Sequence, residues 1–193
     1  MGYAQLIDRK MTVEEYFELE EQSEIRHEYY DGEVYAMSGT SFKHNDIVFN
    51  VWSTLKLFFR GQGCRAFGEC VKLKVSDICY LYPDVVVTCA AKDLSSTHIV
   101  EHPGIVVEII SKTSTRRDRG FKLKQYKTIS SLQYYLIVSQ FEYKVELHSR
   151  LQASDLWTYR SFENIEDVIR LDAFNFEMSL QAIYENIEFL PED

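Results

Sequence analysis

The stretches LYPDVVV, residues 81–87, and GIVVEIIS, residues 104–111, each place one carboxylate inside a run of β-branched and other apolar residues. Apolar runs of this kind are typical of strands that are covered on both faces. The two acids are Asp84 and Glu108. An unpaired carboxylate inside a core is costly or becomes protonated, so each of these acids needs a partner. The stretches therefore predict two core strands that carry chemistry.

The segments around these two stretches predict an α/β (α+β) fold with a central mixed β-sheet flanked by helices and with additional C-terminal strands. Thr12 and Glu15 form a capping-box pattern that predicts a helix from about Val13, and Asp31-Gly32 predicts a hairpin turn. Apolar residues recur at helical spacing over residues 45–60. The order strand, helix, strand over residues 104–139 favours a crossover between parallel strands. Further strands are predicted at 143–150, 156–162 and 167–171, and a helix at 179–187.

The composition favours a globular protein of one domain. A length of 193 residues with 46% apolar residues is enough for one core, so we predict a single domain over residues 1–193, with 1–11 as a poorly ordered or loosely packed segment. No apolar run is long enough to span a membrane, and the N-terminus lacks the apolar segment of a secretory signal. We therefore predict a cytoplasmic protein. The four cysteines form no CxxC pair, which favours buried, reduced thiols over a zinc site.

Two acids on neighbouring strands can share one cation. Neighbouring strands lie about 4.8 Å apart, so side chains of Asp84 and Glu108 on one face of a sheet can approach each other. Hard divalent ions such as Mg²⁺ or Mn²⁺ prefer such carboxylate oxygens, and a nearby lysine would stabilise negative charge on a phosphate. The structural alternatives are that Asp84 accepts backbone N–H groups at a strand start and that Glu108 forms a buried ion pair, for example with Lys122.

The same residues carry a family resemblance. Tyr82-Pro83-Asp84, followed 24 residues after the aspartate by Glu108, resembles the PD-(D/E)xK nuclease pattern. The wider layout resembles the Uma2 family of restriction-endonuclease-like proteins. The matching segments are residues 27–33, 44–45, 82–86, 107–111 and 118–122, together with Tyr126. The resemblance implies a restriction-endonuclease-like core and Mg²⁺-dependent hydrolysis of DNA, with Asp84 and Glu108 as metal ligands.

The sequence departs from the general pattern at one position. That pattern has a lysine two residues after the second acid, where this chain has Ile110. The resemblance places the lysine on the following helix, at Lys122, with Lys124 as the fallback. Lys122 and Tyr126 are four residues apart and are therefore expected on one helix face.

The resemblance also implies supporting residues around the metal. Glu28 would add a ligand or hold a water molecule, although it lies in an acid-rich stretch and could equally be a surface acid. His44 could contact a phosphate or a ligating carboxylate, or simply start a helix in solvent. Tyr126 could pack in the core, and Ser111 could bond the backbone or face the site.

The charge distribution suggests where DNA would bind. The net charge of −9 argues against a general nucleic-acid coat, but residues 112–127 contain seven bases and one acid. This window follows the Glu108 strand, so its basic side chains would either form a solvated helix face or contact DNA phosphates. The residues predicted to contact DNA are Lys112, Arg116, Arg117 and Arg119.

The resulting prediction is a metal-dependent DNA endonuclease that acts as a homodimer, without an organic cofactor and without membrane contact. The first alternative is a catalytically inactive nuclease-fold protein that serves as a nucleic-acid-binding or protein-binding module. The second is a metal-dependent hydrolase of another phosphoester.

Overall fold

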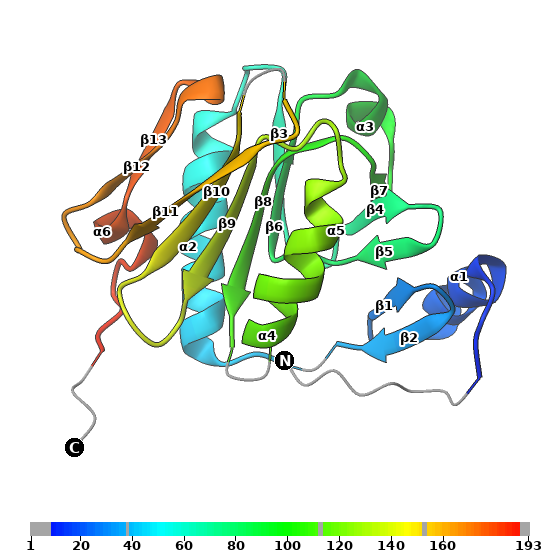
Figure 1. Cartoon of the computed structure of the whole chain (residues 1–193). Helices are drawn as coiled ribbons and strands as arrows, with labels where there is room; N and C mark the ends of the chain where they lie inside the picture. Colours follow the sequence, from blue (N-terminus) through cyan, green and yellow to red (C-terminus); the bar gives the residue numbers. More distant parts are fainter. Residues whose placement is uncertain (1–8, 38, 112–113, 152–153, 190–193) are drawn as a thin grey trace.

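The computed structural model describes residues 9–37, 39–111, 114–151 and 154–189 (Figure 1). Among these residues, no helix is both long and apolar enough to cross a membrane. The helical elements are α1 (Val13–Gln22), α2 (Phe42–Phe58), α3 (Ala91–Ser95), α4 (Thr115–Arg117), the π-helical turn η1 (Asp118–Lys122), α5 (Leu123–Lys127), the 3-10 turn η2 (Asp172–Phe174) and α6 (Leu180–Ile183). The strands are β1 (His27–Tyr30), β2 (Glu33–Ala36), β3 (Arg65–Gly68), β4 (Lys72–Ser76), β5 (Cys79–Leu81), β6 (Val85–Thr88), β7 (Ile99–Val100), β8 (Pro103–Ile110), β9 (Tyr134–Ser139), β10 (Val145–Arg150), β11 (Trp157–Phe162), β12 (Val168–Leu171) and β13 (Phe176–Ser179).

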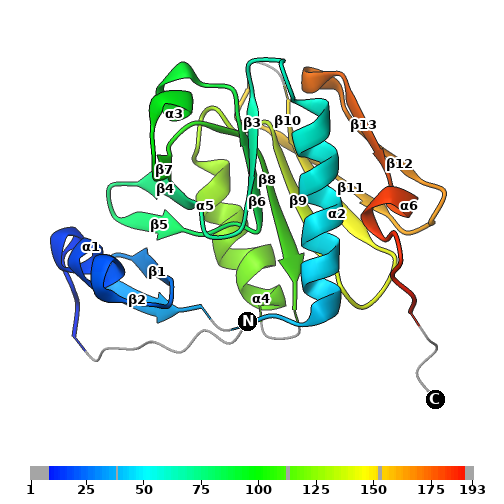
Figure 2. The same ribbon diagram turned by 180° about the vertical axis from the view of Figure 1, so that it is seen from behind.

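A six-stranded mixed sheet in the order β11-β10-β9-β8-β6-β3 forms the centre of the fold. Strands β8 and β9 pair in parallel, and the other pairs are antiparallel. The chain crosses from β8 to β9 through α4, η1 and α5, which lie on one face of the sheet, while α2 covers the opposite face (Figures 1 and 2). The predicted mixed sheet with flanking helices is confirmed.

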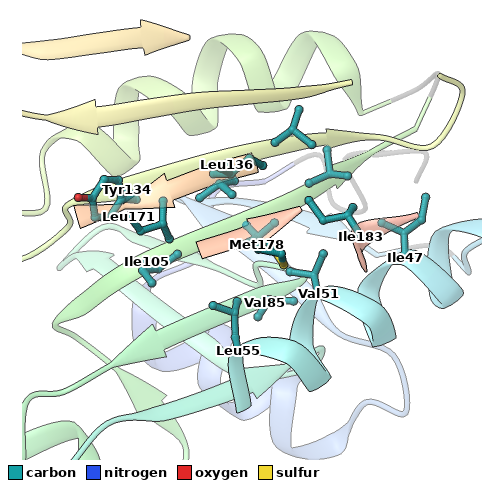
Figure 3. Packing of buried hydrophobic residues seen from close by; sticks show 14 of the residues in the cluster. Ile47, Val51, Leu55, Val85, Ile105, Tyr134, Leu136, Leu171, Met178 and Ile183 are labelled. Carbon is teal, nitrogen blue, oxygen red and sulfur yellow. The ribbon is translucent and has the colours of Figure 1, made fainter. Parts of the chain in front are cut away.

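Alternation along β6 and β8 sorts their side chains onto two faces. Val85 and Ile105 point toward α2 and pack with Ile47, Val51 and Leu55, as Figure 3 shows. The C-terminal hairpin β12–β13 and α6 extend this core. Neighbouring residues of both strands instead contribute to the apolar cluster on the opposite face, beneath α5. Because side chains alternate, the even-numbered acids Asp84 and Glu108 lie on that second face.

A second sheet near the N-terminus was not predicted. It has the strand order β2-β1-β5-β4-β7 and packs with α1. The predicted capping box is confirmed, since Thr12 Oγ1 accepts from Glu15 N–H at 3.2 Å and Glu15 Oε2 accepts from Thr12 N–H at 2.8 Å. The hairpin turn is also confirmed, with left-handed backbone at Asp31 (φ 45°) and Gly32 (φ 88°). Of the predicted N-terminal segment, residues 1–8 lie outside the described residues, and Met11 is buried.

The helix predicted over residues 115–129 is interrupted. A π-helical turn, η1, separates α4 from α5 and ends the regular helical repeat between them. The turn brings Asp118 and Lys122 to the buried side, where both are almost fully enclosed. Single π-helical turns within helices are frequent at functional sites.

Two of the four cysteines are joined, which corrects the prediction of reduced buried thiols. Cys64 and Cys89 form a disulfide with a Cα–Cα distance of 4.0 Å. They lie directly beyond the last paired residues of β3 and β6, Arg65 and Thr88, so antiparallel pairing places them opposite each other. Cys79 is a buried thiol and Cys70 an exposed one. The predicted cytoplasmic location stays a prediction.

The disulfide is expected to stabilise the edge of the central sheet. It closes a chain segment with a sequence separation of 25, for which loop-closure entropy gives a loss of about 3 kcal/mol in the free energy of unfolding when it is removed. Urea denaturation of Cys64→Ala plus Cys89→Ala should show this loss, and Cys70→Ser is the control with an exposed thiol. Equal denaturation midpoints for the double variant and the control would contradict the expectation.

Candidate active site

Pairing of β6 with β8 brings the two predicted acids together. Val85 lies opposite Val107 in the antiparallel register, so the next position places Asp84 opposite Glu108. Both side chains are on the face away from α2, and both are buried, with exposed fractions of 3% and 2%.

The Asp84 carboxylate is held by backbone on one side and faces an imidazole on the other. Asp84 Oδ2 accepts a 2.7 Å hydrogen bond from the Ile109 N–H. This agrees with the alternative prediction that Asp84 accepts a backbone N–H group at a strand start. Asp84 Oδ1 lies 3.3 Å from His44 Nε2. His44 is in the first turn of α2, where its N–H donates to Ser41 Oγ, and its ring is buried. The buried Nε2 atom has no hydrogen-bond partner among the described residues.

The Glu108 carboxylate is held from the helical crossover. Glu108 Oε1 lies 2.9 Å from Lys122 Nζ and accepts a 2.7 Å hydrogen bond from the Tyr126 hydroxyl. The prediction that Lys122 and Tyr126 share one helix face is consistent with both reaching this atom, whereas Lys124 is exposed. The buried ion pair that we considered for Glu108 is therefore present.

Glu28 joins the site from the N-terminal sheet. The carboxylate is fully buried, so the alternative of a surface acid is wrong. Its Oε1 atom lies 2.9 Å from Lys122 Nζ and accepts from the Tyr82 N–H at 3.3 Å, and its Oε2 atom lies 3.2 Å from Arg117 NH2. Lys122 thus bridges Glu28 and Glu108, and this bridge connects the two large sheets.

Sequence reasoning missed Asp118 as a site residue. It lies in the first position of the π-helical turn, is 1% exposed, and its Oδ1 atom is 3.7 Å from Lys122 Nζ. This oxygen has no hydrogen-bond partner in the described parts of the chain. The spacing of four residues between Asp118 and Lys122 was the signal that could have found it.

Comparison with known proteins places this arrangement in a family. The sequence profile of Uma2, described as "Putative restriction endonuclease", matches residues 13–182. The chain belongs to the Uma2 family. The predicted family is therefore confirmed, and the buried acids Glu28, Asp84, Glu108 and Asp118 all lie within the matched range.

Relatives and solved structures agree with this assignment. Two Synechocystis sp. proteins, the "Uncharacterized protein" slr1290 and the "Uncharacterized protein" sll1609, resemble the Uma2 chain. The first is 30% identical over 181 residues, covering 93% of this chain and 94% of the relative, and the second is 31% identical over 144 residues, covering 73% and 81%. A crystal structure of a "putative nuclease belonging to DUF820" from Anabaena variabilis superimposes with a TM-score of 0.73 at 18% identity, covering 92% of this chain and 99% of that chain. This similarity confirms the predicted fold.

Electrostatics in the Uma2 site favour an additional cation. Burial raises the pKa of Glu108 well above its usual range; the carboxylates of Asp118, Asp84 and Glu28 raise it further, and Lys122 lowers it. Burial likewise raises the pKa of Asp118. Three carboxylates, those of Glu28, Glu108 and Asp118, therefore share the cations of Lys122 and Arg117, and more positive charge would stabilise the site.

The side chains present fit a hard divalent metal in chemistry. Carboxylate oxygens are the ligands that Mg²⁺ and Mn²⁺ prefer, and Asp118 Oδ1 accepts no hydrogen bond within the described residues, so it is an available oxygen. Within the described ranges, however, no three acidic, histidine or cysteine side chains already converge to hold an ion. The Lys122 ammonium instead lies between Glu28 and Glu108.

The remaining predicted residues whose side chains the structure describes have structural partners. Ser111 and Ser114 exchange hydrogen bonds between each backbone N–H and the other hydroxyl, at 2.9 and 3.1 Å, and so stabilise the start of α4. Arg117 stacks over the Tyr35 ring at 4.4 Å while it contacts Glu28. Arg119 Nε donates to Glu146 at 2.7 Å. Lys112 and the side chain of Arg116 lie outside the described residues.

A cavity of about 310 Å³ opens next to Asp84. Tyr82, Pro83 and Asp84 form one wall, and Glu69 and Cys70 form another. Among the four buried acids, Asp84 is therefore the one that borders this cavity, which is open to solvent.

Proposed function

We propose that this Uma2 protein is a Mg²⁺-dependent or Mn²⁺-dependent endonuclease that hydrolyses phosphodiester bonds of DNA. The observation that carries the proposal is a group of four buried carboxylates: Glu28, Glu108 and Asp118 surround the ammonium of Lys122, and Asp84 lies opposite Glu108 on the neighbouring strand. Burying so many acids is costly for the fold, which is expected where a protein must hold a divalent cation.

The roles follow from the contacts of each side chain. Asp84 and Glu108 would hold the metal, with Glu28 as a further ligand. A bound divalent ion lowers the pKa of water and stabilises negative charge on a phosphate. The Ile109 N–H orients the Asp84 carboxylate, and the Tyr126 hydroxyl orients Glu108. Lys122 supplies positive charge beside the reacting phosphate.

The substrate contacts and the assembly are further parts of the proposal. Lys112, Arg116, Arg117 and Arg119 would contact DNA phosphates at the mouth of the site. Contact by Arg117 or Arg119 would compete with their ion pairs to Glu28 and Glu146. A homodimer would allow both DNA strands to be cut.

One observation favours a second function. Lys122 binds both Glu28 and Glu108, as a permanent structural ion pair would, and this suits a catalytically inactive module that binds nucleic acid or protein. Metal binding separates the two functions, because the inactive module has no need of a divalent ion.

The test is nicking of supercoiled plasmid by the purified protein with Mg²⁺, Mn²⁺ or EDTA. We expect cutting with either metal and none with EDTA. Asp84→Asn, purified in parallel, is the control for contaminating nuclease; asparagine keeps an oxygen that can accept from the Ile109 N–H. Equal cutting by both proteins would indicate contamination. Absence of both cutting and Mg²⁺ binding by calorimetry would favour the binding module.

A further inference from the structure

A second cavity, of about 360 Å³, lies between the C-terminal half of α2 and strand β3. β3 is the last strand at this edge of the six-stranded sheet, and Figure 2 shows it beside α2. The lining residues are Trp52, Lys56, Arg60, Gly61, Cys64, Arg65, Ala66, Phe67 and Gly68. None of the residues predicted to contact DNA belongs to it.

All ionisable side chains that line this cavity are basic. Its ionisable side chains are Lys56, Arg60 and Arg65, all exposed, and no acid lines it. In the part of the chain that the structure describes, no carboxylate lies within ion-pair distance of these three cations. In a chain with a net charge of −9, this is a local concentration of uncompensated positive charge. The cavity therefore suits an anionic ligand.

Aromatic rings lie directly beside the cations. Lys56 Nζ is 4.4 Å from the centre of the Trp52 ring, and the Arg65 guanidinium is 4.7 Å from that of Phe67. The Trp52 indole N–H donates to the Ala66 carbonyl at 3.1 Å, which fixes the ring against β3. Basic side chains next to flat rings bind the phosphates and bases of nucleic-acid strands.

Consecutive residues at the end of β3 line this cavity and the cavity at Asp84. Gly68, opposite Val85 in β6, lines this cavity, whereas the next residue, Glu69, lines the cavity that opens at Asp84. The Glu69 N–H donates to the Asp84 carbonyl at 2.9 Å. From Gly68 to Arg65, strand β3 covers about 10 Å. Along the axis of a DNA duplex, that length corresponds to about three base pairs.

We propose that this cavity binds the sugar-phosphate backbone of the nucleic-acid strand whose reacting phosphate lies at Asp84. Lys56, Arg60 and Arg65 contact phosphates, and Trp52 contacts a sugar or base. The proposal rests on the proposed function for the identity of the ligand. It differs from the predicted contact through Arg117 and Arg119, because those two side chains already bind carboxylates.

Binding of a fluorescently labelled 20-base-pair duplex in EDTA tests the proposal without cleavage. The cavity variant is Arg60→Glu plus Arg65→Glu. The control, Arg160→Glu plus Arg170→Glu, changes the net charge equally at exposed positions on β11 and β12, away from β3. We expect the Kd of the cavity variant to rise by at least about tenfold and the slope of log Kd against log salt to fall by about 2. The control should change Kd less than about threefold.

Tryptophan fluorescence gives a second, local measurement. The chain has two tryptophans, so Trp157→Phe leaves Trp52 as the reporter. We expect the duplex to quench the Trp52 fluorescence with the Kd found for the labelled duplex. Inorganic phosphate should quench it only at a far higher concentration. Quenching by inorganic phosphate at the duplex concentration would indicate a small-anion site and overturn the proposal. Unchanged duplex binding by the cavity variant, or no duplex binding by the wild type, would also overturn it.

Failure of this proposal is distinguishable from failure of the proposed function. Plasmid nicking by a cavity variant that binds duplex as tightly as the wild type contradicts only the cavity. Duplex binding that depends on Arg60 and Arg65, in a protein that nicks no plasmid with any metal, supports the cavity and contradicts only the endonuclease activity.

Discussion

Replacing Lys122 with methionine is expected to lower the free energy of unfolding by about 3 to 5 kcal/mol, the range found when one partner of a buried ion pair is removed. The ammonium is 1% exposed and lies 2.9 Å from both Glu28 and Glu108. Methionine fills a similar volume but leaves several carboxylates facing one another without a counter-charge. Urea denaturation at pH 7 measures the loss. Lys124→Met, at the exposed neighbouring lysine, is the matched control and should change stability little.

Two further measurements separate charge from packing as the cause. Adding Glu28→Gln to the Lys122 variant removes one of the carboxylates that lost its counter-charge and should recover part of the stability.

The stability lost in the Lys122 variant should also be smaller at lower pH. The raised pKa values of Glu108 and Asp118 mean that the folded protein takes up protons at a pH where the unfolded chain has released them. The stability that this protonation confers is fully present below the pKa of the unfolded chain. It is lost as the pH rises through the raised pKa of the folded protein. A deficit that is equal at pH 5 and pH 7 would point to packing instead.

Glu108→Gln is expected to reduce the rate of metal-dependent plasmid cleavage by about 1,000-fold while leaving stability unchanged or increased. Losing a ligand removes several kcal/mol of charge stabilisation, and every 1.4 kcal/mol is about tenfold in rate. The glutamine oxygen can still accept from Lys122 and from the Tyr126 hydroxyl, so the packing is retained. Neutralising an acid whose pKa is raised by burial also removes a desolvation penalty.

The control for this variant is a buried acid outside the site. Glu20, on helix α1, contacts His27 at 2.9 Å and Lys72 at 3.5 Å, both in the N-terminal sheet, and it makes no ion pair with Lys122 in the described structure. Glu20→Gln should lower stability while the folded protein keeps its cleavage rate. A Glu108→Gln protein that cuts as fast as Glu20→Gln would remove Glu108 from the proposed mechanism.

Local patterns predicted the parts of the fold that depend on neighbours in sequence. The capping box at Thr12 and the turn at Asp31-Gly32 are each specified within a few residues, and both were found. The acids Asp84 and Glu108 could be predicted to meet because each lies in an apolar run that reads as a core strand. Lys122 and Tyr126 could be predicted to share a helix face from their spacing alone.

Other features depend on which strands pair, and no local pattern specifies that. The N-terminal sheet forms because β1 pairs with β5, and this places Glu28 against Lys122 rather than in solvent. The Cys64–Cys89 disulfide depends on the register of β3 with β6. The cavity at Trp52 and Arg65 forms only when α2 and β3 lie side by side. Its positive charge could therefore not be predicted from the sequence, whose net charge is negative.

The bridge from Glu28 through Lys122 to Glu108 has a consequence for biosynthesis. A ribosome delivers Glu28 first, Asp84 and Glu108 later and Lys122 last, and the bridge needs both large sheets to have formed and met. A nascent or partly folded chain therefore carries these acids separately in water, with no enclosed group of ligands. Any reaction at this site therefore begins only when the chain has folded, and the proposed DNA cleavage would be absent from a partly translated chain.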